Sequence, residues 1–153
     1  MRLRTVIVLS SMLSSLSIGV IAQTKDPVAG AWEQVSSKNM KTGAMAQMPT
    51  PPLHLVYADG HYVQFTAAAK RAKGNTPRAE MTKEQLVERY NLQGQYGTYR
   101  VAGSKLTRRV IAAALPDNEG RETTSDFRIE GDTLIVTTTG PDGGTETRYR
   151  RLK

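Results

Sequence analysis

The chain has 153 residues, of which 21 are Lys or Arg and 14 are Asp or Glu, with no cysteine and a formal net charge of +7. This length suits one domain, and the missing cysteines exclude disulfides and thiolate metal sites. Excess positive charge is typical of proteins that bind nucleic acid or anionic lipid, but here the basic residues are scattered and are not interleaved with aromatic ones. We therefore expect no nucleic-acid binding.

The N-terminus has the pattern of a secretory signal peptide. Residues 1–4 are basic, residues 5–19 are apolar with interspersed serines, and Val20 and Ala22 occupy the small-residue positions of a cleavage site. The apolar core is shorter than the roughly 20 residues needed to cross a bilayer. We expect removal of residues 1–22, no stable membrane insertion afterwards, and a periplasmic or secreted domain formed by residues 23–153. Losing Arg2 and Arg4 leaves 19 basic residues against 14 acidic ones.

The first strands of the mature chain are expected to form a hairpin after an isolated strand. The strand opens at Gly30-Ala31-Trp32 and runs to about Asn39, and the Pro- and Gly-containing residues 40–52 form a loop. The segments 53–57 and 61–66 then flank Asp59-Gly60, a strong signal for a type I′ turn.

A short helix follows a basic linker of residues 67–80. Thr82 and Gln85 have the spacing of a capping box, and Leu86, Val87 and Tyr90 give the helix an apolar face that ends near Asn91. From Tyr96 onward, five short strands rich in Thr, Val, Ile, Tyr and Phe are joined by glycine turns. These strands are expected at residues 96–101, 105–113, 122–130, 133–139 and 145–152.

Eight strands linked in this way predict an antiparallel meander, which usually curls closed at this length. The expected fold is therefore all-β: an approximately eight-stranded up-and-down barrel with one short helix inserted between strands 3 and 4. An interior of this size can hold a small ligand, although its own side chains can also fill it completely.

Four short motifs, taken in order, resemble those of bacterial lipocalin-like domain proteins. They are Gly30-Ala31-Trp32, the Tyr57–Gly60 hairpin, Gly97-Thr98-Tyr99, and the closing Arg148–Arg151. The resemblance covers residues 28–152 and implies a calycin-type barrel that often holds a small hydrophobic ligand. It also implies a structural role for Trp32, which would close the barrel base and stack on Arg150 or Arg151. The disulfides of lipocalins are absent, and the inserted helix is unlike theirs.

Turn geometry predicts which residues face the interior, because residues directly opposite each other in a hairpin share a face. The expected inward pairs are Val56 with Val63, His54 with Phe65, Tyr99 with Arg108, and Phe127 with Val136. We take these as the ligand-binding candidates: Arg108, Tyr99, His54, Phe65, Val56, Val63, Phe127 and Val136.

Arg108 is the most informative candidate, because a guanidinium is costly to bury without a partner. One interpretation is that Arg108 and Tyr99 hold the carboxylate of an amphiphilic ligand. The other is that Arg108 reaches the barrel mouth and stays solvated. His54 is either a hydrogen-bonding or acid–base group or a structural histidine. Met40, Met45 and Met48 form either an adaptable lid over an apolar cavity or an ordinary loop.

The leading hypothesis is an exported lipocalin-like protein that binds a small hydrophobic or amphiphilic molecule inside the barrel. We predict no metal, no cofactor and no catalytic residue; whether the protein is an enzyme stays open, leaning towards not. One alternative is a barrel-type cyclase or isomerase in which His54, Tyr99 or Arg108 transfers a proton. The other is a non-catalytic interaction module of the cell envelope that uses its basic rim.

Overall fold

Eight antiparallel strands close into a barrel in the computed structural model, which describes residues 26–67, 71 and 73–153. The predicted signal peptide, residues 1–22, lies outside the described residues. The predicted fold is confirmed, including the helix α1 (Lys83–Tyr90) between the third and fourth strands. The strands are β1 (Gly30–Asn39), β2 (His54–Ala58), β3 (His61–Ala67), β4 (Leu92–Ala102), β5 (Lys105–Ala113), β6 (Glu122–Glu130), β7 (Thr133–Thr138) and β8 (Thr145–Arg151).

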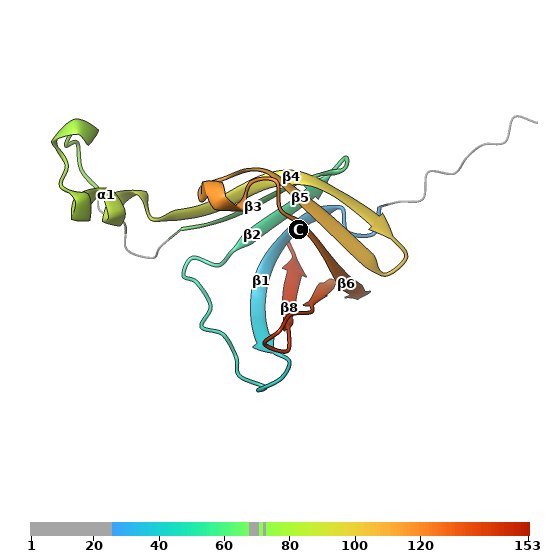
Figure 1. Ribbon diagram of the computed structural model, residues 1–153. Coiled ribbons are helices and arrows are strands. Elements are labelled where there is room, and N and C mark those ends of the chain that lie inside the picture. Colours follow the sequence, from blue (N-terminus) through green and yellow to red (C-terminus); the bar gives the residue numbers. More distant parts are fainter. Residues whose placement is uncertain (1–25, 68–70, 72) are drawn as a thin grey trace, which may run out of the picture.

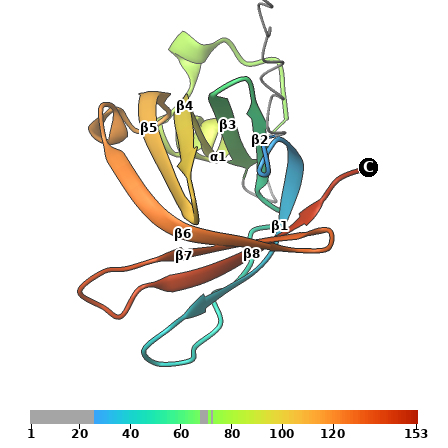
Figure 2. The ribbon, with the colours of Figure 1, turned by 90° about the vertical axis from the view of Figure 1, so that its right-hand side faces the viewer.

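The topology is up-and-down, because each strand pairs with its neighbours in the chain. Strand β1 pairs with both β2 and β8, which closes the sheet and leaves no free edge. The loop between β1 and β2 and the excursion that carries α1 both extend away from the barrel (Figures 1 and 2). In the part of the chain that the structure describes, no helix is long and apolar enough to span a bilayer.

The hairpin turns have the predicted geometry and fix the predicted registers. Asp59 and Gly60 both have positive φ, at 47° and 76°, as a type I′ turn requires. Consequently Val56 lies opposite Val63. The register predictions for the hairpins β4–β5 and β6–β7 are also confirmed, with Tyr99 opposite Arg108 in the first.

The base of the barrel is closed around Trp32, which is fully buried. Its indole Nε1 donates to the Val28 carbonyl at 2.8 Å, and the Arg151 guanidinium lies 4.0 Å from the centre of its ring. Arg151 also donates to the Ala29 carbonyl at 2.7 Å. The stacking predicted for Trp32 is therefore confirmed with Arg151, and it ties the last strand to the chain before the first.

Large side chains fill the barrel above this base. Tyr57 and Tyr99 meet edge to face, with ring centres 4.7 Å apart. The hydroxyl of Tyr99 donates to the carboxylate of Asp26, just ahead of the first strand. The buried hydrophobic cluster consists of Val28, Trp32, Leu55, Tyr57, Tyr62, Tyr99, Leu106, Leu134, Val136 and Tyr149.

The connection between β3 and β4 projects from the barrel (Figure 1). We call its described residues, 71 and 73–91, the arm. The predicted capping box is present, since the Thr82 hydroxyl accepts from the Gln85 amide and the Gln85 side chain accepts from the Thr82 amide. No residue of α1 is buried, and Val87 and Tyr90 are 62% and 48% exposed. The helix is thus stabilised locally and has no barrel surface against its apolar side.

Candidate functional site

The predicted interior face of the β2–β3 hairpin is wrong. His54 is exposed, and Val56, Val63 and Phe65 are 42%, 50% and 47% exposed on the outside of the barrel. The reason lies in the pairing of β3 with β4, which places Tyr62 opposite Gly97. Gly97 shares a face with Tyr99 and Arg108 because residues alternate along a strand.

The inward face of this hairpin is the one opposite to the predicted face of His54, Val56, Val63 and Phe65. Leu55 and Tyr57 on β2 and Tyr62 on β3 are buried, while Gln64 is partly buried. Both faces alternate regularly and both contain apolar residues, so the hairpin alone does not reveal which one turns inward.

Arg108 faces the interior from the middle of β5, as predicted, and is partly buried. Its guanidinium lies 5.6 Å from the centre of the Tyr62 ring and donates to the Gln64 side-chain oxygen at 3.4 Å. All 14 Asp and Glu residues of the chain fall within the described ranges, and none of them forms an ion pair with Arg108. Arg108 is therefore a cation that faces the interior without a carboxylate partner.

Three buried hydroxyl groups are also without hydrogen-bond partners among the described residues: those of Tyr57, Tyr62 and Ser125. Burial raises the pKa of Tyr57 to about 12, with the charge of Arg108 opposing the effect, and burial also raises the pKa of Tyr62. These phenols are protonated at neutral pH and keep an unused donor. Such orphaned groups are rare in folded proteins and call for a partner.

Tyr99 does not join Arg108 in the way predicted. It lies opposite Arg108 across the β4–β5 ladder, but its hydroxyl is taken by Asp26 at the barrel base. Burial, followed by the hydrogen bond to Asp26, raises the pKa of Tyr99. Tyr57 and Tyr62 are instead the tyrosines whose hydroxyls are buried without a hydrogen-bond partner among the described residues. In the sequence, these two tyrosines lie opposite each other on the β2–β3 hairpin, on the face that was not predicted to turn inward.

Arg108 opens onto a cavity of about 200 Å³ between β3, β4, β5 and the β5–β6 connection. Arg121 lines the same cavity and donates to the Asn118 side chain at 3.0 Å. Two guanidinium groups therefore line one small cavity. Its lining consists of Tyr62, Gln95, Arg108, Val110, Asn118, Arg121 and Thr123.

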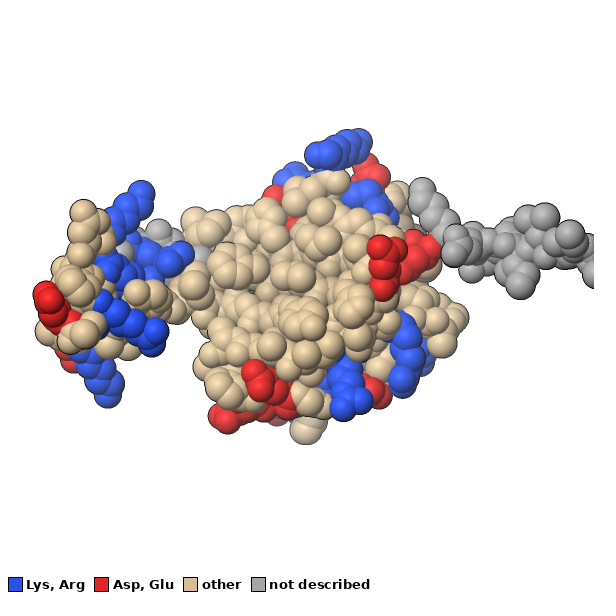
Figure 3. Space-filling model, turned by 90° about the horizontal axis from the view of Figure 1, so that it is seen from above, with Lys and Arg blue, Asp and Glu red and all other residues tan. Residues whose placement is uncertain are grey.

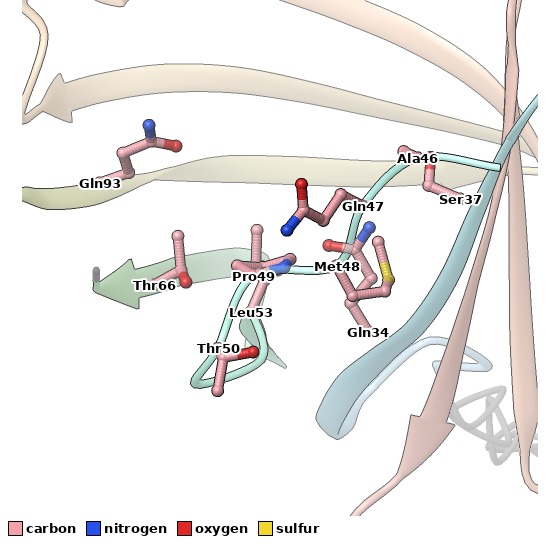
Figure 4. A pocket seen from close by; sticks show the side chains of 10 residues that line it. All are labelled: Gln34, Ser37, Ala46, Gln47, Met48, Pro49, Thr50, Leu53, Thr66 and Gln93. Atoms are coloured by element: carbon pink, nitrogen blue, oxygen red, sulfur yellow. The ribbon is translucent and has the colours of Figure 1, made fainter. Parts of the chain in front are cut away.

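A larger cavity of about 580 Å³ lies beneath the β1–β2 loop (Figure 4). Gln34 and Ser37 line it from β1, Thr66 from the end of β3, and Gln93 from the start of β4. A third cavity, of about 160 Å³, shares Thr66 and Gln93 with the large one and Gln95 and Asn118 with the Arg108 cavity. We call these three cavities together the upper lumen; amide and hydroxyl groups are prominent in their lining.

The remaining ligand-binding candidates lie in the hydrophobic cluster, and the proposed methionine lid lies in the β1–β2 loop. Phe127 and Val136 face inward as predicted, but they pack with the hydrophobic cluster, and no cavity described above includes them. Their contact with a ligand stays a prediction. Of the three methionines proposed as a lid, Met48 lines the large cavity, whereas Met40 and Met45 are 49% and 61% exposed.

This chemistry suits holding an anion or a polar group rather than moving a proton. Of the three groups assigned to proton transfer in the enzyme hypothesis, His54 points outward and the Tyr99 hydroxyl is engaged by Asp26. Within the described ranges, no three His, Asp or Glu side chains gather in a way that would hold a metal ion.

The sequence matches no protein-family model, and no curated protein is significantly similar to it. Solved structures do resemble the fold. A lipocalin-like protein from Bacteroides uniformis is 14% identical, with a TM-score of 0.50 over 82% of this chain and 98% of that one. An uncharacterized protein from Bacteroides eggerthii is 11% identical, with a TM-score of 0.51 over 82% and 99%. As-p18, an extracellular fatty acid binding protein, is 14% identical with a TM-score of 0.40 over 82% and 96%. Strand order, closure and the first two of these structures together show that the chain has the fold of a lipocalin-like barrel.

Proposed function

We propose that the protein binds a small amphiphilic molecule in its upper lumen and holds an acidic group of that molecule on Arg108. The observation that carries the proposal is the inward guanidinium without a carboxylate partner. A charge away from bulk water is costly unless it is paired, and an anionic ligand group would provide the pairing. The unpaired hydroxyls of Tyr57 and Tyr62 would add donors to the same anion.

The lining of the upper lumen supports an amphiphile over a plain hydrocarbon chain. Ligand pockets commonly range from about 300 to 1,000 Å³, and the large cavity of about 580 Å³ falls within this range. Gln34, Gln93 and Thr66 offer amide and hydroxyl groups there, while Leu53, Met48 and Pro49 offer apolar contact. An amphiphilic ligand has polar and apolar surface and can therefore contact both kinds of lining group.

The same proposal includes export to the periplasm or the exterior, on the basis of residues 1–22. Native mass spectrometry of the protein isolated from its own host would test the ligand and the export together. We expect an N-terminus at Gln23 and a small adduct that is lost on denaturation. A mature chain without an adduct, which also binds none of the amphiphiles below, would contradict the binding proposal.

The role of Arg108 is testable by measuring how tightly the chain that begins at Gln23 binds a fluorescent fatty acid, dansylaminoundecanoic acid. Arg108→Gln removes the charge but keeps a polar side chain, and we expect binding to weaken by about tenfold or more, as the loss of a charge-assisted hydrogen bond predicts. The matched control is Arg109→Gln, because Arg109 is the next residue on β5 and is exposed.

The methyl ester of the same probe separates charge recognition from cavity filling. We expect the ester to bind wild type and Arg108→Gln equally, since it has no charge to lose. If Arg108→Gln and Arg109→Gln bind the acid equally well, Arg108 is not the anion site.

A further inference from the structure

The outside of strands β2 to β4 carries an apolar surface that the barrel itself does not use. Val56, Val63 and Tyr96 form one row across three neighbouring strands, since Val63 pairs with both of the others. Phe65 continues the surface one step along β3, lying over Gly94. We call these four residues the outer patch. Each is 42% to 50% exposed.

No charged residue lies in the row that runs across Val56, Val63 and Tyr96, whereas the row of Phe65 reaches Glu33, paired with Arg150, at its β1 end. The residues paired directly with the patch on the same face are Ala31, His54, Gly94 and Ala112. Seen from above, the barrel surface is uncharged over its middle, and its Lys, Arg, Asp and Glu side chains lie towards the margins (Figure 3). Contiguous exposed apolar surface of this kind marks a contact with another surface.

The arm extends from the same two strands that carry most of the patch, because it connects the end of β3 to the start of β4. Lys and Arg side chains gather on it in the view that also shows the uncharged barrel surface (Figure 3). The arm has an excess of two positive charges, with five basic residues against three acidic ones: Arg71, Lys73, Arg78, Lys83 and Arg89 against Glu80, Glu84 and Glu88. Exposed Val87 and Tyr90 add apolar groups, and the Arg78 guanidinium lies 5.4 Å from the Tyr90 ring centre.

The arm holds its shape through its own contacts. The Arg89 guanidinium donates to the carbonyls of Thr76 and Gly74, and Arg71 donates to the carbonyl of Arg89. Lys73 and Lys83 make no ion pair among the described residues. Their ammonium groups are exposed and free to meet an anionic surface.

We propose that the outer patch and the arm together dock the protein on an anionic phospholipid surface. Apolar and aromatic side chains favour the boundary between head groups and acyl chains, while neighbouring Lys and Arg residues attract anionic head groups. The net charge of the chain has the complementary sign, with 19 basic and 14 acidic residues after loss of the signal peptide. A second copy of the chain is a poorer occupant, because it would bring a second basic arm to the same contact.

Docking in this way would place the open end of the barrel near the lipid. Thr66 and Gln93 lie at the two points where the arm leaves the barrel, and both line the large cavity (Figure 4). The docking proposal does not rest on the proposed ligand, because its test uses vesicles and no added amphiphile.

The test is flotation of the chain beginning at Gln23 with vesicles of phosphatidylcholine alone or mixed with phosphatidylglycerol. This chain contains every residue of the closed barrel and excludes the apolar signal core, which would bind vesicles by itself. We expect binding to the phosphatidylglycerol vesicles only, weakening as salt is raised because screening acts on exposed charges.

Two pairs of variants separate the patch and the arm from general effects. Val63→Asp should reduce vesicle binding by about tenfold or more, whereas Val35→Asp, at a valine 42% exposed on β1, should not. Lys73→Glu with Lys83→Glu should reduce it similarly, whereas Lys38→Glu with Lys41→Glu, an equal change of charge outside the arm, should not. Thermal unfolding of each variant checks that the barrel is intact.

Three outcomes would overturn the proposal. The first is that wild type binds neither kind of vesicle. The second is that Val35→Asp, or Lys38→Glu with Lys41→Glu, loses as much binding as the matched patch or arm variant. The third is that Val63→Asp converts an oligomer to a monomer in size-exclusion chromatography, which would assign the patch to a second copy of the chain.

Discussion

Gly97 decides how closely two strands of the barrel approach each other. A Cβ at this position would lie 1.9 Å from the carbonyl oxygen of Arg109 and 3.0 Å from the Tyr62 ring. The ladder between β4 and β5 shifts register between Tyr96 and Gly97, so the backbone is already displaced there. The absence of a side chain thus allows the bulge and the inward position of Tyr62 together.

We predict that Gly97→Ala destabilises the barrel by about 1–3 kcal/mol, because the added methyl group has to displace backbone. Gly140→Ala is the matched control, since a Cβ there meets nothing within 4 Å. It should change the free energy of unfolding by less than about 0.5 kcal/mol. Urea denaturation measures both. Equal effects of the two variants would show that the close approach at Gly97 is not what constrains the fold.

Tyr57 provides a residue-scale prediction for alkaline pH. Burial raises its pKa from 10.0 to about 12. The folded state therefore retains the phenolic proton after the unfolded state has lost it. The resulting stability is fully present below pH 10 and is lost as the pH rises to about 12. Tyr57→Phe should remove this part of the alkaline loss, on the order of 2–3 kcal/mol.

At neutral pH, Tyr57→Phe should leave stability unchanged or raise it, because the hydroxyl it removes is buried without a partner. Unfolding free energies measured in urea from pH 7 to 12 test both expectations. Tyr90→Phe, on exposed α1, is the control and should keep the full alkaline loss. If wild type, Tyr57→Phe and Tyr90→Phe lose the same unfolding free energy between pH 10 and 12, the loss does not come from Tyr57.

Among the elements, α1 is stabilised by its own capping and not by packing. Its first turn has the complete Thr82–Gln85 capping box, yet no residue of the helix is buried. Helices in proteins mostly depend on an apolar face packed against a neighbour. The arm is therefore an addition to the barrel and contributes little to its stability.

This view predicts that the arm can be removed. Ala67 at the end of β3 lies directly opposite Leu92 at the start of β4. Replacing residues 68–91 with Asn-Gly should give a two-residue hairpin with the same register. Because loop closure depends weakly on length, the unfolding free energy should change by less than about 2 kcal/mol. The shortened protein should lose vesicle binding, whereas unfolding of the barrel would show that the arm is structural.

The closed barrel as a whole depends on a contact between its two chain ends. Arg151 on β8 stacks on Trp32 of β1 and donates to the Ala29 carbonyl. A Cβ on Gly30, which has a φ of +128°, would lie 2.5 Å from the Arg151 guanidinium. The base thus has space for this one side chain and no more.

We expect Arg151→Ala to lower the free energy of unfolding by about 1–3 kcal/mol, through loss of the stacking and of the hydrogen bond to Ala29. Arg150→Ala is the matched control. The Arg150 side chain is 63% exposed and pairs with Glu33 on the surface, so its loss should cost less than about 1 kcal/mol. Thermal or urea unfolding distinguishes the two; a larger effect at Arg150 would contradict the role of the base.

Much of the fold was predictable because its signals are local. Glycine turns such as Asp59-Gly60 fix hairpin registers, and Thr82 with Gln85 fixes the start of the helix. The inward position of Arg108 followed in the same way from its own short hairpin. Which face of the β2–β3 hairpin turns inward could not be predicted in this way. Residues 68–91 separate β3 from β4, and a connection of this length does not fix the register between the two strands.

The amino-acid sequence by itself determined the eight strands, their hairpin registers and the capped helix, since each depends on residues close in the chain. The resemblance to lipocalin-like proteins predicted that Trp32 stacks on an arginine of the last strand, and the tertiary structure selected Arg151 over Arg150. Only the tertiary structure decided that Tyr57 and Tyr62 turn inward while Val56, Val63 and Phe65 turn outward. Pairing Tyr62 with Gly97 settles that choice, and a strand's two faces exchange with a shift of one residue. The composition of the upper lumen and of the outer patch both follow from that one non-local pairing.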